Sequence, residues 1–271
     1  MRAGFYMRRA WVGLWYRLLF ARLSGQAEIT RANVEKVFAS EGRAKRWWRL
    51  TRIKRAQGRF FGEVLNFERL LELCPPPVIE GAGREAFFDA VAAKRPVILL
   101  TGHIGNYALG LHFLKQKGVD AGFLYRTRGN VLLDSRFDGM LRLTGQRGFK
   151  IGHRAQGGYE GKLKDFIEFL GEGHVAVMLG DHRDRSGEKI RFLGRRAPTS
   201  LTPAKLARAH DALLIPCFIL REGGGVRFRA VLDAPIPHKG SLRSMMRVFN
   251  DRMTQIIQDD PTQWSWTIRR W

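Results

Sequence analysis

Short apolar runs alternate with helical segments through residues 96–220, and this alternation limits the folds open to the chain. Three of the four runs are rich in Val, Ile and Leu, and segments with apolar residues at helical spacing lie between the runs. Runs of this kind are typical of buried parallel strands joined by helices. The expected strands are 96–101, 121–125, 174–179 and 212–220, and the expected helices are 106–117, 130–144, 159–171 and 201–210.

The last run of this region indicates that the sheet is mixed. Glycines at 223–225 separate it from Val226–Leu232, in which apolar residues alternate with polar ones as in a hairpin strand. The fold class is therefore α/β, with a mixed, mostly parallel sheet flanked by helices. Residues 30–72 are predicted to be helical, and no repeat or linker interrupts 26–271, which we interpret as a single α/β domain.

Residues 1–25 are predicted to form a helix that lies on a membrane surface. Arg17 interrupts the apolar run, so the segment suits neither a cleaved signal peptide nor a spanning helix. At helical spacing Trp11, Trp15, Leu18 and Leu19 share one side, and the nearby arginines can reach lipid phosphates. The alternative is a core helix with a few solvated arginines.

The charge of the chain calls for anionic partners. Lys and Arg number 47 against 25 Asp and Glu, which gives a formal net charge of +22. With 45% hydrophobic residues the chain can still bury a core, so a disordered basic tail is excluded. An anionic membrane surface and an acidic carrier protein both satisfy such a charge. A nucleic acid would also satisfy it, but no recognisable nucleic-acid-binding module is present, so no specific nucleic acid is expected.

Two strand ends carry side chains suited to catalysis. His103 follows the run 96–101, and Asp181 follows the run 174–179. Ligands of parallel sheets bind beyond the carboxyl ends of the strands, and a histidine there can act as a general base. A lone histidine in such a turn is nevertheless often structural. The histidines and cysteines form no cluster with metal-ligand spacing, so no metal site is expected.

A set of ordered blocks is more specific than either strand end alone. The blocks are Thr101–Tyr107, Leu124–Arg126, Leu179–Asp181, Phe192–Thr199, Pro203–Ala207 and Pro261–Arg270. In order and spacing they resemble the late acyltransferases of lipid A biosynthesis, which belong to the lysophospholipid acyltransferase superfamily. The resemblance extends over nearly the whole chain.

The resemblance implies an acyltransferase on the cytoplasmic face of a bacterial inner membrane. Such enzymes move a fatty acyl chain from a thioester of acyl carrier protein or coenzyme A to a lipid or glycolipid acceptor, and no cofactor is implied. His103 takes the place of the histidine in the family's His-x4-Asp/Glu motif. The acid of that motif is absent, because Ala108 stands in its position.

Three explanations of Ala108 remain open from the sequence. Asp181 can replace the missing acid across the sheet, with His182 as a second candidate. The acceptor can be an amine, which needs less help from a base. The chain can also be a non-catalytic relative that binds lipids on the same scaffold.

Three further residues are expected to bind substrate. Asn106 fits the family pattern around His103. Arg126 follows a predicted strand, where its guanidinium can clamp a phosphate or a thioester oxygen, and Arg195 lies in a Gly-Arg-Arg turn. A solvated surface arginine is the alternative for Arg126 and for Arg195.

Overall fold

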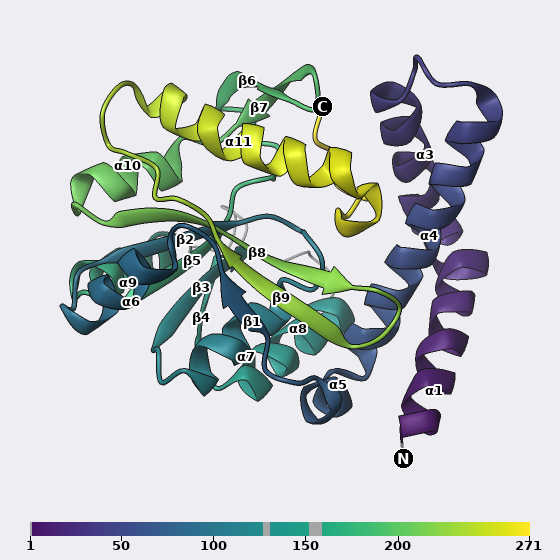
Figure 1. The fold of residues 1–271 in the computed structure, drawn as a ribbon, viewed down its shortest axis with the longest axis horizontal. Coiled ribbons are helices and arrows are strands. Elements are labelled where there is room, and N and C mark those ends of the chain that lie inside the picture. The colour runs from purple at the N-terminus through teal and green to yellow at the C-terminus, as the bar shows by residue number, and fades with distance from the viewer. Residues whose placement is uncertain (1, 127–130, 152–158) are drawn as a thin grey trace.

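The computed structural model describes residues 2–126, 131–151 and 159–271. An α/β body contains a central sheet with helices on both faces, and the N-terminal helices pack along one side of it (Figure 1). The two termini lie in different parts of the molecule. The C-terminus lies near the hairpin of β6 (Glu188–Phe192) and β7 (Arg195–Thr199), and the N-terminus lies at the far end of α1 (Arg2–Trp15).

The central sheet is mixed, as the sequence predicts. Its strand order is β1-β9-β8-β2-β5-β3-β4, and every neighbouring pair is parallel except β8 with β9. The strands are β1 Val78–Glu80, β2 Val97–Thr101, β3 Ala121–Arg126, β4 Arg147–Ile151, β5 Val175–Leu179, β8 Leu213–Glu222 and β9 Arg227–Leu232. A separate antiparallel pair contains β6 Glu188–Phe192 and β7 Arg195–Thr199.

Apolar residues of β2 alternate between two hydrophobic layers, because successive side chains of a strand point to opposite faces. Ile98 and Leu100 join the core beneath α9, α10 and α11, whereas Val97 and Leu99 join the core beneath α6, α7 and α8. The helices on the sheet are α6 Arg84–Ala92, α7 Ala108–Gln116, α8 Val131–Thr144, α9 Tyr159–Gly171, α10 Thr202–Ala209 and α11 Leu242–Asp259, and a short 3-10 turn, η3, covers Pro261–Gln263.

The predicted strands of the parallel core and the Val226–Leu232 hairpin strand are confirmed, whereas the shorter strands are additions. β1 and β4 are the edge strands of the sheet, and β6 and β7 form a two-stranded ribbon with several exposed arginines. Edge strands tolerate charge and lack a continuous apolar run, so periodicity does not reveal them.

The N-terminal region forms several helices rather than the two predicted ones. These are α1 Arg2–Trp15, a π-helical turn η1 Tyr16–Phe20, α2 Ala21–Leu23, α3 Gln26–Val37, α4 Arg43–Leu65 and α5 Phe67–Leu73. The prediction of one helix over 30–72 is therefore wrong in its boundaries. The chain turns between α3 and α4, where Gly42 precedes the first residue of α4, and again at Asn66.

Helices α1 and α4 approach each other closely through glycines. A Cβ atom on Gly58 of α4 would lie 2.6 Å from the carbonyl oxygen of Gly13 in α1, and one on Gly62 would lie 2.8 Å from the carbonyl oxygen of Arg9. No other residue fits at that separation without moving the backbone. Gly58 and Gly62 are four residues apart and thus share one face of α4.

The outer side of the N-terminal helices exposes large apolar residues. Trp11 of α1 is 71% exposed, and Trp15, Leu18 and Leu19 are also exposed, whereas Phe5 and Tyr16 are buried. The four residues predicted to share one side thus face away from the protein, unlike those of a core helix. Among the described residues, none of the helices is long and apolar enough to cross a membrane.

We expect the Gly58→Ala variant to lower the melting temperature, because the added methyl group meets the backbone of α1. An overpacked contact costs about 1–3 kcal/mol, which exceeds the gain of up to about 1 kcal/mol from replacing a helical glycine by alanine. Gly4→Ala in α1 is the matched control, since nothing lies within 4 Å of its added Cβ. Equal melting temperatures of the two variants would contradict the close approach.

Candidate active site

His103 lies in the turn between β2 and α7, at the carboxyl end of the central strands. Gly105 makes this turn possible: its φ is +55°, and a Cβ atom there would lie 1.8 Å from the carbonyl oxygen of Ile219 in β8. Two backbone hydrogen bonds join this turn to the end of η3 and the segment after it. The amide of Gly105 donates to the carbonyl oxygen of Gln263, and the amide of Ser265 donates to the carbonyl oxygen of His103.

Asp181 lies beside His103 because their strands are neighbours. β2 and β5 pair in parallel, with Thr101 opposite Leu179, so both chains leave the sheet at the same edge. The Nδ1 atom of His103 is 2.9 Å from Oδ1 of Asp181, and the amide of His103 donates to Oδ2 at 2.9 Å. The structure thus brings together the two residues that the sequence predicts to be catalytic.

The Asp181 carboxylate is fully buried and still remains charged. Burial alone would raise its pKa, but the charge of His103, the hydrogen bond from His103, the charge of His182 and the hydrogen bond from the Trp264 indole together hold the pKa of Asp181 below its usual range. An ionised carboxylate only accepts hydrogen bonds, so Nδ1 of His103 carries the proton. When the His103 ring is neutral, Nε2 then bears the lone pair that a general base requires.

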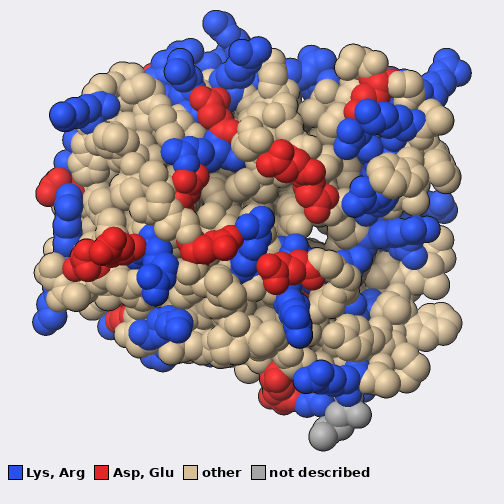
Figure 2. Space-filling model, viewed as in Figure 1, with Lys and Arg blue, Asp and Glu red and all other residues tan. Residues whose placement is uncertain are grey.

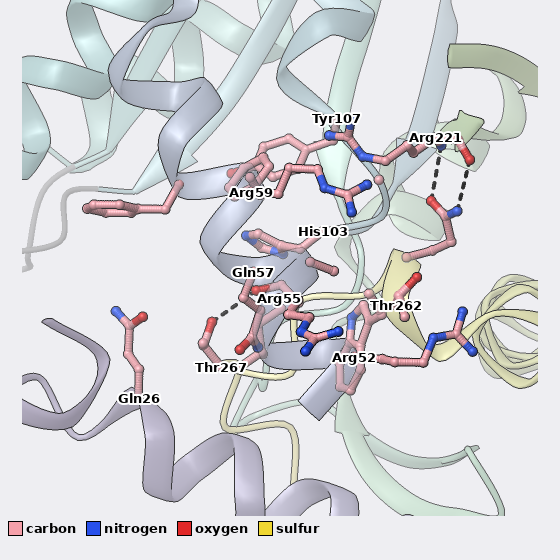
Figure 3. A pocket seen from close by; sticks show the side chains of 18 of the residues that line it. Gln26, Arg52, Arg55, Gln57, Arg59, His103, Tyr107, Arg221, Thr262 and Thr267 are labelled. Carbon is pink, nitrogen blue, oxygen red and sulfur yellow. Dashed lines mark hydrogen bonds between the residues drawn. The ribbon is translucent and has the colours of Figure 1, made fainter. Parts of the chain in front are cut away.

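A cavity of about 1060 Å³ lies against His103. It lies between the α/β body and the N-terminal helices, and its lining includes Tyr16 and Phe20 from η1, Phe61 from α4 and Tyr107 from the turn before α7. Figure 3 shows Arg55 and Arg59 on either side of His103 in that view. In Figure 2 the surface is hollowed between the N-terminal helices and the body.

Positive charge dominates the cavity wall. Among the described lining residues seven are arginines and one, Asp260, is acidic. The arginines are Arg52, Arg55 and Arg59 of α4, Arg183 and Arg185 after β5, Arg221 of β8, and Arg269 near the C-terminus. Burial and the neighbouring charges of Arg221 and Arg9 lower the pKa of Arg59, so these cations crowd one another. An anion bound in the cavity relieves this repulsion.

Two aromatic rings contact the His103 ring edge to face. The His182 ring centroid is 4.7 Å from that of His103, and the Tyr107 ring centroid is 5.0 Å away. His182, the second sequence candidate for the missing acid, therefore lies against the His103 ring and lines the cavity, whereas Asp181 contacts Nδ1.

The three residues predicted to bind substrate lie elsewhere than on the cavity wall. Asn106 is fully buried and donates to Oε2 of Glu63 at 3.0 Å, so it joins the His103 turn to α4. Arg126 ends β3. Arg195 begins β7, where its side chain donates to the carbonyl oxygen of Lys36 at 3.0 Å. The structure gives Asn106 and Arg195 protein partners instead of a place in the cavity.

A buried carboxylate that the sequence analysis did not single out connects α1 with this site. Glu63 of α4 is fully buried and accepts from Arg9 of α1 at 3.1 Å, from Asn106, and from the cavity arginine Arg221. Glu63 is the single acidic residue of the basic segment 43–65, and that isolation is the one signal in the sequence that marks it.

The family model described as bacterial lipid A biosynthesis acyltransferase matches residues 7–271. The chain is therefore a member of the lipid A biosynthesis acyltransferase family and belongs to the acyltransferase class of proteins. No curated protein matches it.

Ala108 is part of a hydrophobic cluster. It is the first residue of α7, is 2% exposed, and packs in a cluster that includes Phe5, Phe67 and Leu109. The site therefore has its carboxylate just after β5 and apolar packing at the start of α7.

We expect Ala108→Glu to destabilise the protein rather than to restore a better catalytic pair. Its carboxylate would enter an apolar cluster, at a cost on the order of 3 kcal/mol. Thermal unfolding measures the loss, with Ala44→Glu as control, because Ala44 is exposed in the first turn of α4. A glutamate at 108 that leaves the melting temperature unchanged and raises acyl transfer would contradict this expectation.

Proposed function

We propose that the protein transfers a fatty acyl chain from an acyl thioester to a hydroxyl group of a lipid or glycolipid, with His103 as the general base and Asp181 as its partner. The observation that carries the proposal is the contact between Nδ1 of His103 and the buried Asp181 carboxylate at the wall of a large cavity. Membership of the acyltransferase family supports the same reaction class.

The proposed reaction uses one proton-handling residue in two steps. Nε2 of His103 takes the proton of the acceptor hydroxyl, whose oxygen attacks the carbonyl carbon of the thioester. The carbon–sulfur bond then breaks, and the thiolate takes the proton from His103. Asp181 stabilises the imidazolium that exists between these steps, as the carboxylate does in a Ser-His-Asp triad. An ester and a free thiol are the products.

The arginines of the cavity favour an acceptor that carries phosphate. Guanidinium groups bind phosphate oxygens with two parallel hydrogen bonds, and the seven that line this cavity face a single carboxylate among the described lining residues. A phosphorylated glycolipid of the lipid A type fits this environment. The thioester donor is acyl carrier protein or coenzyme A, both of which are also anionic.

The exposed tryptophans suggest where the acceptor comes from. Trp11 and Trp15 lie on the outer side of α1, and Tyr16 and Phe20 of the following turn line the cavity. Segment 1–25 thus combines an apolar outer side with a contribution to the cavity. We propose that it rests on the cytoplasmic face of the bacterial inner membrane, where aromatic and basic side chains suit the lipid headgroup layer.

The central test is mass spectrometry of lipids after incubation of the purified protein with a defined acyl thioester and a lipid A precursor. The wild type should add one acyl mass. His103→Ala should abolish transfer, and Asp181→Asn should lower turnover by about 10³- to 10⁴-fold, as loss of the carboxylate does in comparable triads.

Arg195→Ala is the matched control for these variants, because Arg195 lies outside the cavity wall. It should transfer acyl chains as the wild type does. Activity retained by His103→Ala would overturn the assignment of the base. Lipid binding without acyl transfer in the wild type would favour the non-catalytic relative.

A second prediction concerns the phosphate. Arg59→Met keeps an unbranched apolar stem and removes the charged guanidinium, so we expect KM for a phosphorylated acceptor to rise roughly tenfold or more, the value of one charge-assisted hydrogen bond. The same acceptor after phosphatase treatment should show little change between wild type and variant. Arg31→Met, an exposed arginine of α3 outside the cavity, serves as control. An equal KM effect on both acceptors would argue against phosphate recognition.

A further inference from the structure

The C-terminal segment contacts the candidate active site at Asp181 and next to His103. Trp264 is 1% exposed, and its indole Nε1–H donates to Oδ2 of Asp181 at 2.9 Å. Its backbone forms an isolated antiparallel bridge with Ile104, next to His103. Trp264 thus contacts Asp181 through its side chain and the neighbour of His103 through its backbone.

The three donors to Asp181 divide between its two oxygens. Oδ2 accepts from the Trp264 indole and from the amide of His103, whereas Oδ1 is within 2.9 Å of the Nδ1 atom of His103. A carboxylate with one oxygen held by two fixed N–H groups cannot rotate freely. The remaining oxygen then points at the imidazole.

We propose that Trp264 is a positioning residue, whose indole N–H holds Oδ2 of Asp181 so that Oδ1 is presented to His103. Its role rests on the proposed function, because it acts on the base through Asp181 and does not itself handle the acyl group. The ring is wedged between Phe192, Trp266 and Trp271, with centroid separations of 5.4, 5.0 and 6.3 Å, so the N–H direction is set by core packing.

Removal of the N–H changes the basicity of the pair in a defined direction. Without the indole donor, the Asp181 charge is less neutralised and attracts a proton on His103 more strongly, so the pKa of His103 should rise. Loss of the Asp181 charge should lower it. Three other charged or titratable groups lie near the pair: His182, Tyr107 and Arg270. Those across the cavity are Arg52, Arg55, Arg59, Arg183, Arg185, Arg221, Asp260 and Arg269. None of these residues is substituted in the two variants.

The chain offers a matched control in the neighbouring tryptophan. Trp266 is also fully buried in the same core, and its indole donates to the carbonyl oxygen of Pro261 at 2.7 Å. Trp264→Phe and Trp266→Phe therefore each remove one buried indole N–H and keep an aromatic ring. Only the first of these two N–H groups touches Asp181.

The experiment is a pH titration of the histidine side chains by NMR, with His103→Ala identifying the His103 signal. Trp264→Phe should move the His103 midpoint upward by roughly half to one pH unit, and Asp181→Asn should move it downward by roughly one to three. Trp266→Phe should leave it in place. Equal midpoints in Trp264→Phe and Trp266→Phe would overturn the proposal.

A measurement on the wild type covers the case in which Trp264→Phe fails to fold. The indole N–H signal of Trp264 should shift with the same midpoint as His103, and the signal of Trp266 should not. An indole signal of Trp264 that is indifferent to the titration of His103 would also overturn the proposal.

Activity separates this proposal from the proposed function. With acyl transfer established, the acid limb of the pH profile of kcat/KM should follow the NMR midpoints, and kcat of Trp264→Phe should fall roughly tenfold or more at neutral pH with KM little changed. NMR midpoints that behave as expected in a protein without any acyl transfer would refute the function and leave the role of Trp264 intact.

Discussion

The charge of Asp181 is the constraint on which the site depends. A carboxylate with no exposure to water is stable only when donors and a positive partner replace its hydration. Here the donors come from two places far apart in sequence, the turn after β2 and the segment after η3. Arg270, also buried, ties this segment to the loop after β5 by donating to the carbonyl oxygen of His182. The C-terminal residues thus fix the geometry of the strand-end pair.

Helix α4 joins the N-terminal helices to the candidate active site. Gly58 and Gly62 form the face against α1, whereas Arg52, Arg55 and Arg59 form the face toward the cavity. Glu63 connects α1 with the α/β body, because its carboxylate accepts hydrogen bonds from Arg9 of α1 and from Asn106 and Arg221 of the body. A displacement of α1 therefore changes the environment of a buried charge close to His103. The N-terminal segment is part of the cavity wall and also exposes large apolar residues on its outer side.

The sequence predicts those parts of the molecule that local patterns determine. Buried strands show as apolar runs, and the carboxyl ends of parallel strands meet at one edge of the sheet. The sequence alone therefore offers Asp181 as a candidate partner of His103. The cavity arginines cannot be predicted in this way, because Arg52, Arg55 and Arg59 look like a solvated helix face until their partner is known. Arg126 and Arg195 are predicted to bind substrate from a position after a strand and in a Gly-Arg-Arg turn, and such positions do not fix where a long side chain reaches.

The contact between His103 and Asp181 depends on how their strands are placed in the sheet, and not on a fixed spacing along the sequence. An acid at the start of α7 would share the element that follows His103, and its placement would depend on the turn between them. Asp181 instead lies two residues after β5, whose register against β2 is set by five residue pairs. A parallel pair in the middle of a sheet is among the most rigid supports that a fold offers, and a carboxylate there also accepts the backbone amide of His103. The start of α7 is then free to pack against Phe5 and Phe67, the same cluster in which α1 meets the body. The packing of Ala108 and the attachment of the N-terminal helix thus belong to one hydrophobic cluster.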